Sequence, residues 1–163
     1  MKIIKNKFYT SPSDLNNFVS CKYLIKNEIK FLNKEIKKNE ESFDKKLWKE
    51  FGLKHEKKHF KLLGSKYKKS ISIKQDIDEK ERNKQTLAAI QKGYDLIYHA
   101  YLIDEDFRGE CDFLIKSNMP SNLGDFSYEV YDTKITRKPR PRHILQITSY
   151  SHMLNKIQGI VPQ

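Results

Sequence analysis

Cysteines and long apolar runs are scarce in this sequence, and each shortage excludes a class of protein. The two cysteines, Cys21 and Cys111, stand far apart, so we expect neither a disulfide nor a zinc site held by cysteines. No run of roughly 18 apolar residues occurs, so no membrane-spanning helix is expected. Residues 1–10 also lack the apolar core of a signal peptide. The sequence therefore predicts a cytoplasmic protein without a membrane partner.

Arginine is scarce too, whereas lysine is abundant and brings the formal net charge to +11. Such a charge favours a polyanionic partner, most simply nucleic acid. Lysine makes up 27 of the 32 basic residues, however, and an A/T-rich genome alone produces that bias. Residues 1–80 hold 21 basic and 11 acidic side chains, against 11 and 10 in residues 81–163. The basic surplus is therefore N-terminal.

The chain of 163 residues is long enough to bury one core. Periodicity and turn residues predict a helix from Ser11 to about residue 32, a helix over 42–63, a strand over 71–75, a helix over 81–92, a hairpin over 95–116, a strand over 126–135 and a helix over 141–156. This order predicts an α/β fold in which helices cover a central sheet. We expect a single domain over 1–163, with a helical N-terminal part (11–63) and a catalytic core (66–163).

The predicted helix over 42–63 has an apolar face made by residues three and four positions apart. Its members are Phe43, Leu47, Phe51, His55, His59 and Leu62. We expect Trp48 in the core, since a lone tryptophan is more often packed than used as a stacking platform. Glu56 lies off this face, so we expect its carboxylate in solvent.

Two strand-like segments each contain a carboxylate, Asp112 and Asp132. An unpaired charge in such a segment is costly, so it usually has a charged partner or a metal. Alternation places Glu110 and Asp112 on one face of the first strand, and Asp132 and Lys134 on one face of the second. On neighbouring strands the two carboxylates converge, and a hard cation such as Mg²⁺ is then needed to hold them together.

A simpler interpretation makes Asp112 and Lys134 a cross-strand ion pair and Asp132 a turn residue. An Asp-x-Lys pattern by itself favours this alternative, because the pattern is short. The context favours a metal site instead, because Asp132 and Lys134 end a regularly alternating segment and Gly109-x-x-Asp112 lies in the strand before it.

Four short motifs follow one another on a predicted helix, two predicted strands and a final predicted helix. They are Gly52-Leu53-Lys54-His55 on a helix, Gly109-Glu110-Cys111-Asp112 on a strand, Asp132-Thr133-Lys134 on a strand and Gln146-Ile147-Thr148-Ser149-Tyr150 on a helix. In order and placement they resemble the motifs of the RecB-like branch of the PD-(D/E)XK nucleases, G-x-x(-x)-H, G-x-x-D, (D/E)-x-K and Q-x-x-x-Y. The resemblance covers about residues 11–160.

The resemblance implies a metal site for Mg²⁺ or Mn²⁺. Asp112 and Asp132 would bind the cation together with the main-chain carbonyl of Thr133, and His55 would be a further ligand. Lys134 would act on the attacking water and on the charge of the transition state.

The same resemblance assigns supporting residues. Gln146 and Tyr150 would orient Lys134 or a substrate phosphate from one face of the last helix. Arg137, Arg140 and Arg142 follow the site and would contact a nucleic-acid backbone, although ordinary surface charge explains them equally well.

The fold implied by the resemblance is a restriction-endonuclease-like core with a central mixed sheet. A further strand normally follows the last helix of that core, whereas this sequence stops at residues 159–163. We therefore expect a core that lacks its last strand, completed by a further domain or a partner chain. Some relatives hold an iron–sulfur cluster, but only Cys21 matches a cluster cysteine here. We expect no cluster, and expect Cys21 to pack within a helix.

The resemblance thus predicts a metal-dependent nuclease that acts on DNA, in repair or recombination. One alternative is a catalytically silent nucleic-acid-binding remnant. A third is a zinc protease, because His55-Glu56-Lys57-Lys58-His59 matches H-E-x-x-H. No third ligand follows at metalloprotease spacing, and the protease hypothesis explains only one segment where the nuclease hypothesis explains four.

Overall fold

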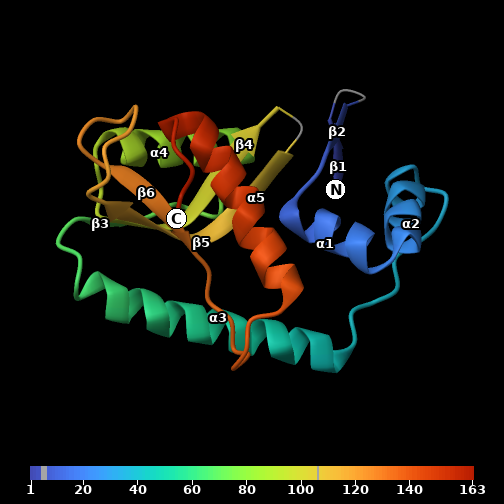
Figure 1. The fold of residues 1–163 in the computed structure, drawn as a ribbon. Coiled ribbons are helices and arrows are strands. Elements are labelled where there is room, and N and C mark those ends of the chain that lie inside the picture. Colours follow the sequence, from blue (N-terminus) through green and yellow to red (C-terminus); the bar gives the residue numbers. More distant parts are fainter. Residues whose placement is uncertain (5–6, 106) are drawn as a thin grey trace.

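The computed structural model describes residues 1–4, 7–105 and 107–163. Figure 1 shows a central sheet with helices on both sides and the N-terminal elements beside it. The elements are β1 (Lys2–Ile4), β2 (Lys7–Tyr9), α1 (Pro12–Ser20), α2 (Lys22–Leu32), α3 (Phe43–Gly64), β3 (Ser70–Ser72), α4 (Glu79–Gln91), β4 (Leu96–Asp104), β5 (Phe107–Ser117), β6 (Ser127–Tyr131) and α5 (Pro141–Gln158). Within the described part of the chain, no helix has the length and apolar character needed to cross a bilayer.

The main sheet has the strand order β3-β4-β5-β6. β3 runs parallel to β4, whereas β4, β5 and β6 pair antiparallel in sequence order. A parallel pair needs a crossover, and α4 provides it between β3 and β4. The predicted α/β architecture, a mixed sheet flanked by helices, is confirmed.

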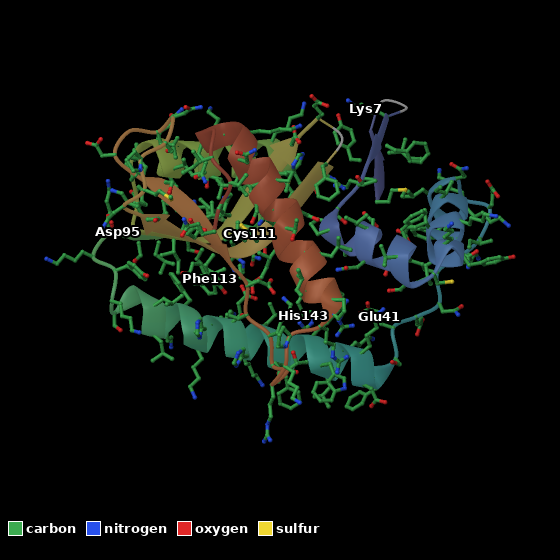
Figure 2. All side chains as sticks on the ribbon, in the orientation of Figure 1. Lys7, Glu41, Asp95, Cys111, Phe113 and His143 are labelled. Carbon is green, nitrogen blue, oxygen red and sulfur yellow. The ribbon has the colours of Figure 1, made fainter. Side chains whose placement is uncertain are left out.

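Each face of the sheet has its own apolar core. On one face, α4 and α5 pack against the strands through residues that include Ile90, Met153 and Leu154. The opposite face is covered by the C-terminal half of α3, where Phe60 and Leu63 pack against strand residues. Those strand residues are Leu96, Tyr98, Phe113 and Ile115. Phe113, labelled in Figure 2, lies between the sheet and α3.

The two central strands change faces partway along. In β5, Cys111 belongs to the core under α4 and α5, whereas Phe113 belongs to the core under α3. Regular alternation would put both on one face, so the alternation expected through 107–115 is interrupted at Asp112. β4 changes faces opposite this point, at His99, whose φ of +57° is uncommon for a residue other than glycine. The hairpin predicted over 95–116 is correct, but the alternation of side chains between the two faces of the sheet is interrupted at Asp112.

The N-terminal part contains two helices instead of the single helix predicted to about residue 32. α1 begins as predicted, with Ser11 and Asp14 forming a capping box. Cys21 then has an extended backbone (φ −165°, ψ 113°), which ends α1 and starts α2. Cys21 is exposed, so the expected packing within a helix is wrong. The antiparallel pairing of β1 with β2 was not predicted.

Only the C-terminal half of α3 packs against the sheet, and Figure 1 shows the other half extending beyond it. Phe43, Trp48 and Phe51 consequently remain 77%, 65% and 48% exposed. The prediction that Trp48 lies in the core is therefore wrong. The helix was predicted almost to the residue, but its periodicity did not show how much of its length the sheet would cover.

β6 is shorter than predicted, because it ends at Tyr131 instead of residue 135. Asp132, Thr133 and Lys134 follow the strand. The N–H of Thr133 donates to the side chain of Asp112, and not to the backbone of β5, so the ladder ends there.

Candidate active site

Asp112 and Asp132 lie opposite each other where β5 and β6 stop pairing. The register pairs Phe113 with Tyr131, which makes the two aspartates the next opposing positions. Oδ2 of Asp112 accepts hydrogen bonds from the N–H of Thr133 at 2.7 Å and from its hydroxyl at 3.1 Å. The structure thus brings Asp112, Asp132 and Thr133 together at one point of the sheet.

The Asp132 carboxylate is almost fully buried, with 1% of its side chain exposed. Burial raises the pKa of Asp132 well above its usual range, and the negative charge of Asp112 raises it further. Lys134 forms an ion pair with Asp132, whereas the cross-strand alternative had paired it with Asp112. Two carboxylates and one ammonium therefore share the site and leave it net negative.

Gln146 and Tyr150 lie one helical turn apart on α5, and their side chains interact with each other beside the two aspartates. Nε2 of Gln146 donates to Oδ1 of Asp132 at 3.3 Å. Tyr150 is buried, and its hydroxyl donates to the main-chain carbonyl of Glu110, so it holds β5 in place beside Asp112. A Cβ on Gly109 would lie 2.9 Å from the Tyr150 ring, which explains why glycine is needed there. The glycine and tyrosine motifs thus belong to one packing contact.

α3 brings His55 and Glu56 to the site from the other side. His55 is exposed and lines the groove in front of Asp112. The Glu56 side chain is only 14% exposed, so the expectation that it lies in solvent is wrong. Burial raises the pKa of Glu56 to about 7, and the charge of Asp112 acts in the same direction. The sheet packs against Phe60 and Leu63, and this rotation of the helix turns Glu56 inward.

His99 is a second site neighbour that the sequence did not indicate. Its Nδ1 lies 2.9 Å from Oε1 of Glu110 and 3.4 Å from Oε1 of Glu56. Arg82 pairs with the other oxygen of Glu110, and burial lowers the pKa of His99 to about 4. The sequence contained a signal for Glu56, because it lies four residues after the motif residue Gly52 and therefore on the same face of the helix. His99 had none, because a strand-like run does not reveal a positive φ.

The three arginines are all exposed. Arg142, in the first turn of α5, lines the groove. Arg140 occupies the N-cap position of α5, and Arg137 lies in the preceding loop. Only Arg142 is therefore brought to the groove itself, and the nucleic-acid role of all three arginines remains a prediction.

These residues border a groove of about 730 Å³ between α3, the loop after β6 and the start of α5. Figure 2 shows His143, one of its lining residues, where α5 approaches α3. The groove is lined by Trp48, Lys49, Gly52, Leu53, His55, Glu56, Asp112, Thr133, Lys134, Ile135, Thr136, Arg142 and His143. It has the size and the mixed polar and apolar lining of a ligand site.

The donor atoms at this site fit a hard divalent cation. Oδ2 of Asp132 is buried and, among the described residues, has no hydrogen bond beyond its ion pair with Lys134. Oε1 of Glu56 is likewise buried, with Nδ1 of His99 3.4 Å away. Mg²⁺ is typically held by one or two carboxylates, with water and substrate phosphate completing its shell. Asp112 and Asp132 supply such a pair.

The structure does not gather a complete protein cage for a metal. Within residues 1–4, 7–105 and 107–163, no three His, Cys, Asp or Glu side chains are grouped closely enough to hold an ion. The His55 and His59 rings stack on each other 6.3 Å apart, and His59 also packs near Phe113. The H-E-x-x-H hypothesis therefore gains no support, and His55 as a ligand remains a prediction.

Comparisons with protein-family models, with curated proteins and with solved structures each returned no match to this chain.

Proposed function

We propose that this protein is a metal-dependent nuclease that hydrolyses phosphodiester bonds in DNA. The observation that carries the proposal is the buried Asp132 beside Asp112. Asp132 pairs with Lys134, and both Asp112 and Lys134 line the open groove. Burial raises the pKa of Asp132, and the neighbouring charge of Asp112 raises it further, so a cation that joins the two carboxylates would relieve both costs. The resemblance of the four motifs adds repair or recombination as the setting.

Each side chain has a definite task in this proposal. Asp112 and Asp132 hold the cation, which when bound polarises the phosphate and acidifies water. Thr133 fixes the orientation of Asp112 through two hydrogen bonds, and Gln146 fixes that of Asp132. Lys134 donates to the attacking water or to the oxygens that gain charge on phosphorus.

The test is cleavage of end-labelled linear DNA, single- and double-stranded, with Mg²⁺ or Mn²⁺ and with EDTA. Lys134→Ala is expected to lower the cleavage rate by roughly 100-fold or more, because an oriented donor to the transition state is lost. Lys84→Ala is the matched control, since Lys84 is exposed on α4, on the other side of the sheet. It is expected to cleave at the wild-type rate.

Two outcomes would contradict the proposal. Metal-independent cleavage, or an unchanged cleavage rate in Lys134→Ala, would show that this site does not catalyse the reaction. DNA binding that falls steeply with salt but is never followed by cleavage would favour the silent remnant instead.

A further inference from the structure

The N-terminal half of α3 presents an apolar strip to solvent. The strip consists of Phe43, Leu47, Trp48 and Phe51, which are 77%, 38%, 65% and 48% exposed. Three of the four are aromatic, and the Trp48 and Phe51 rings meet edge to face at 6.2 Å. Exposing such large side chains together is unfavourable, so a contiguous strip usually marks a binding surface.

The strip is continuous with the candidate active site. Trp48, Gly52 and Glu56 follow one another at four-residue spacing, so they form one line along α3, and all three line the groove. This line covers about 12 Å of helix, a span of more than one nucleotide. A Cβ on Gly52 would meet no atom within 4 Å, so the protein's own packing does not require glycine there. The gap leaves room for a ligand between the aromatic ring and the carboxylates.

The charge around the strip suits a polyanion. α3 contains seven lysines and three acidic residues. Lys49, Lys134 and Arg142 line the same groove as Trp48. An exposed apolar helix face that docks another protein does not need such a surplus of positive charge. Aromatic rings interleaved with lysines are instead the arrangement that binds single-stranded nucleic acid.

We propose that the α3 strip binds single-stranded DNA, with a base stacked on Trp48 and the strand running past Gly52 to the carboxylates. The inference rests on the proposed nuclease function, and names the form of DNA that the site accepts. A single strand is required because the bases of an intact duplex are stacked on each other, and their faces cannot reach the indole. A duplex would therefore have to be frayed at an end to enter.

Trp48 is the only tryptophan in the chain, so its fluorescence reports on the strip alone. The full chain is titrated with a short oligothymidylate in EDTA, where binding is measured without cleavage. We expect the oligonucleotide to quench the Trp48 emission, and a blunt DNA hairpin of equal charge not to quench it. Oligouridylate is the comparison arm for RNA.

Affinity of the variants is measured by anisotropy of a labelled oligothymidylate. Trp48→Ala is expected to weaken binding about 5- to 150-fold, which corresponds to the loss of one stacked base. Trp48→Phe should restore most of the affinity, because phenylalanine also stacks. Tyr23→Ala is the matched control, since Tyr23 is an equally exposed aromatic residue (68%) on α2, and it should bind like the wild type.

Several results would overturn the inference. If oligothymidylate binds without quenching and with equal affinity to Trp48→Ala, the strip does not take part in DNA binding. Metal-dependent cleavage in the same protein would then still support the nuclease proposal. Tighter binding of the hairpin or of oligouridylate would contradict the assigned ligand. Concentration-dependent self-association that Trp48→Ala abolishes would assign the strip to a second copy of the chain. Quenching that persists in a cleavage-deficient Lys134→Ala variant supports the strip independently of catalysis.

Discussion

Among single residues, Glu56 has the environment least suited to its charge. Its carboxylate is mostly buried near Asp112, and its pKa is raised to about 7 from the ordinary value of 4.5. A raised pKa means that the folded state binds a proton more tightly than the unfolded state does. Glu56 therefore lowers the free energy of unfolding progressively as the pH rises from about 4.5 to 7.

We predict that Glu56→Gln raises the free energy of unfolding at pH 8 by about 1–3 kcal/mol, because no buried charge remains. The gain should be small at pH 5, where the wild-type carboxyl is already protonated. Urea unfolding at both pH values measures it.

Glu50→Gln is the matched control for this prediction. Glu50 lies on the same helix, fully exposed, and Lys54 lowers its pKa. Its replacement should give no gain at pH 8. His99 changes stability in the opposite sense, since its lowered pKa favours the neutral ring and adds stability as the pH rises from about 4 to 6.5. Comparing each variant with the wild type at the same pH cancels that contribution.

At the scale of elements, α3 decides how the site is enclosed. Its C-terminal half is held by Phe60 and Leu63, and its N-terminal half forms one wall of the groove. Gly52 lies in the groove half, where glycine costs helix stability relative to alanine and no neighbour requires it. Gly52 therefore weakens α3, and no packing contact requires it. We attribute its presence to the groove, which a larger side chain would narrow.

We predict that Gly52→Ala stabilises the protein by about 0.5–1 kcal/mol while it lowers the rate of DNA cleavage. The added methyl group improves the helix and enters the path of the strand. Thermal unfolding and the cleavage assay measure the two effects on the same sample.

Gly64→Ala serves as the comparison, because Gly64 ends α3 away from the groove and a Cβ there also meets no atom within 4 Å. Its cleavage rate should stay at the wild-type value. A Gly52→Ala variant that cleaves as fast as the wild type would contradict the role of the gap.

In the whole molecule, the basic N-terminal half and the nearly neutral C-terminal half of the sequence meet at the groove. α3 belongs to residues 1–80, which hold the basic surplus, and it lies against the aspartates of the C-terminal half. The site is net negative at its centre and has basic side chains at its edge. A divalent cation should therefore bind the folded chain and stabilise it.

We predict that Mg²⁺ at ten times its dissociation constant raises the free energy of unfolding by about 1.4 kcal/mol at pH 8. For a chain of this size that is an increase in Tm of roughly 3–6 °C. The increase should be smaller at pH 5, where protons compete for Glu56 and Asp132. Differential scanning calorimetry with Mg²⁺ and with EDTA measures it.

Asp112→Asn should lose this Mg²⁺-dependent shift, because the carboxylate pair is broken. Asp125→Asn is the control, since Asp125 is exposed in the loop before β6, and it should keep the shift. An equal shift in Asp112→Asn and the wild type would place the cation elsewhere.

The sequence by itself determined the order of the main elements, the α/β class, and the two strands that place Asp112 and Asp132, one carrying Asp112 and the other ending just before Asp132. It could do so because periodicity, capping residues and turns are local, and because two short strands close in sequence tend to pair. Gly109 and Tyr150 were also identified as motif residues, although the contact between them was not.

Only the tertiary structure decided which side of α3 faces the sheet and how much of the helix the sheet covers. The first choice buries Glu56, and the second leaves Trp48 exposed. A helix of 22 residues with apolar side chains on more than one side can pack in several rotations, and the choice depends on the shape of the sheet. The face change at His99 and Asp112 was equally hidden, because a backbone irregularity leaves no mark on the alternation of residue types. The groove exists because of these two nonlocal choices.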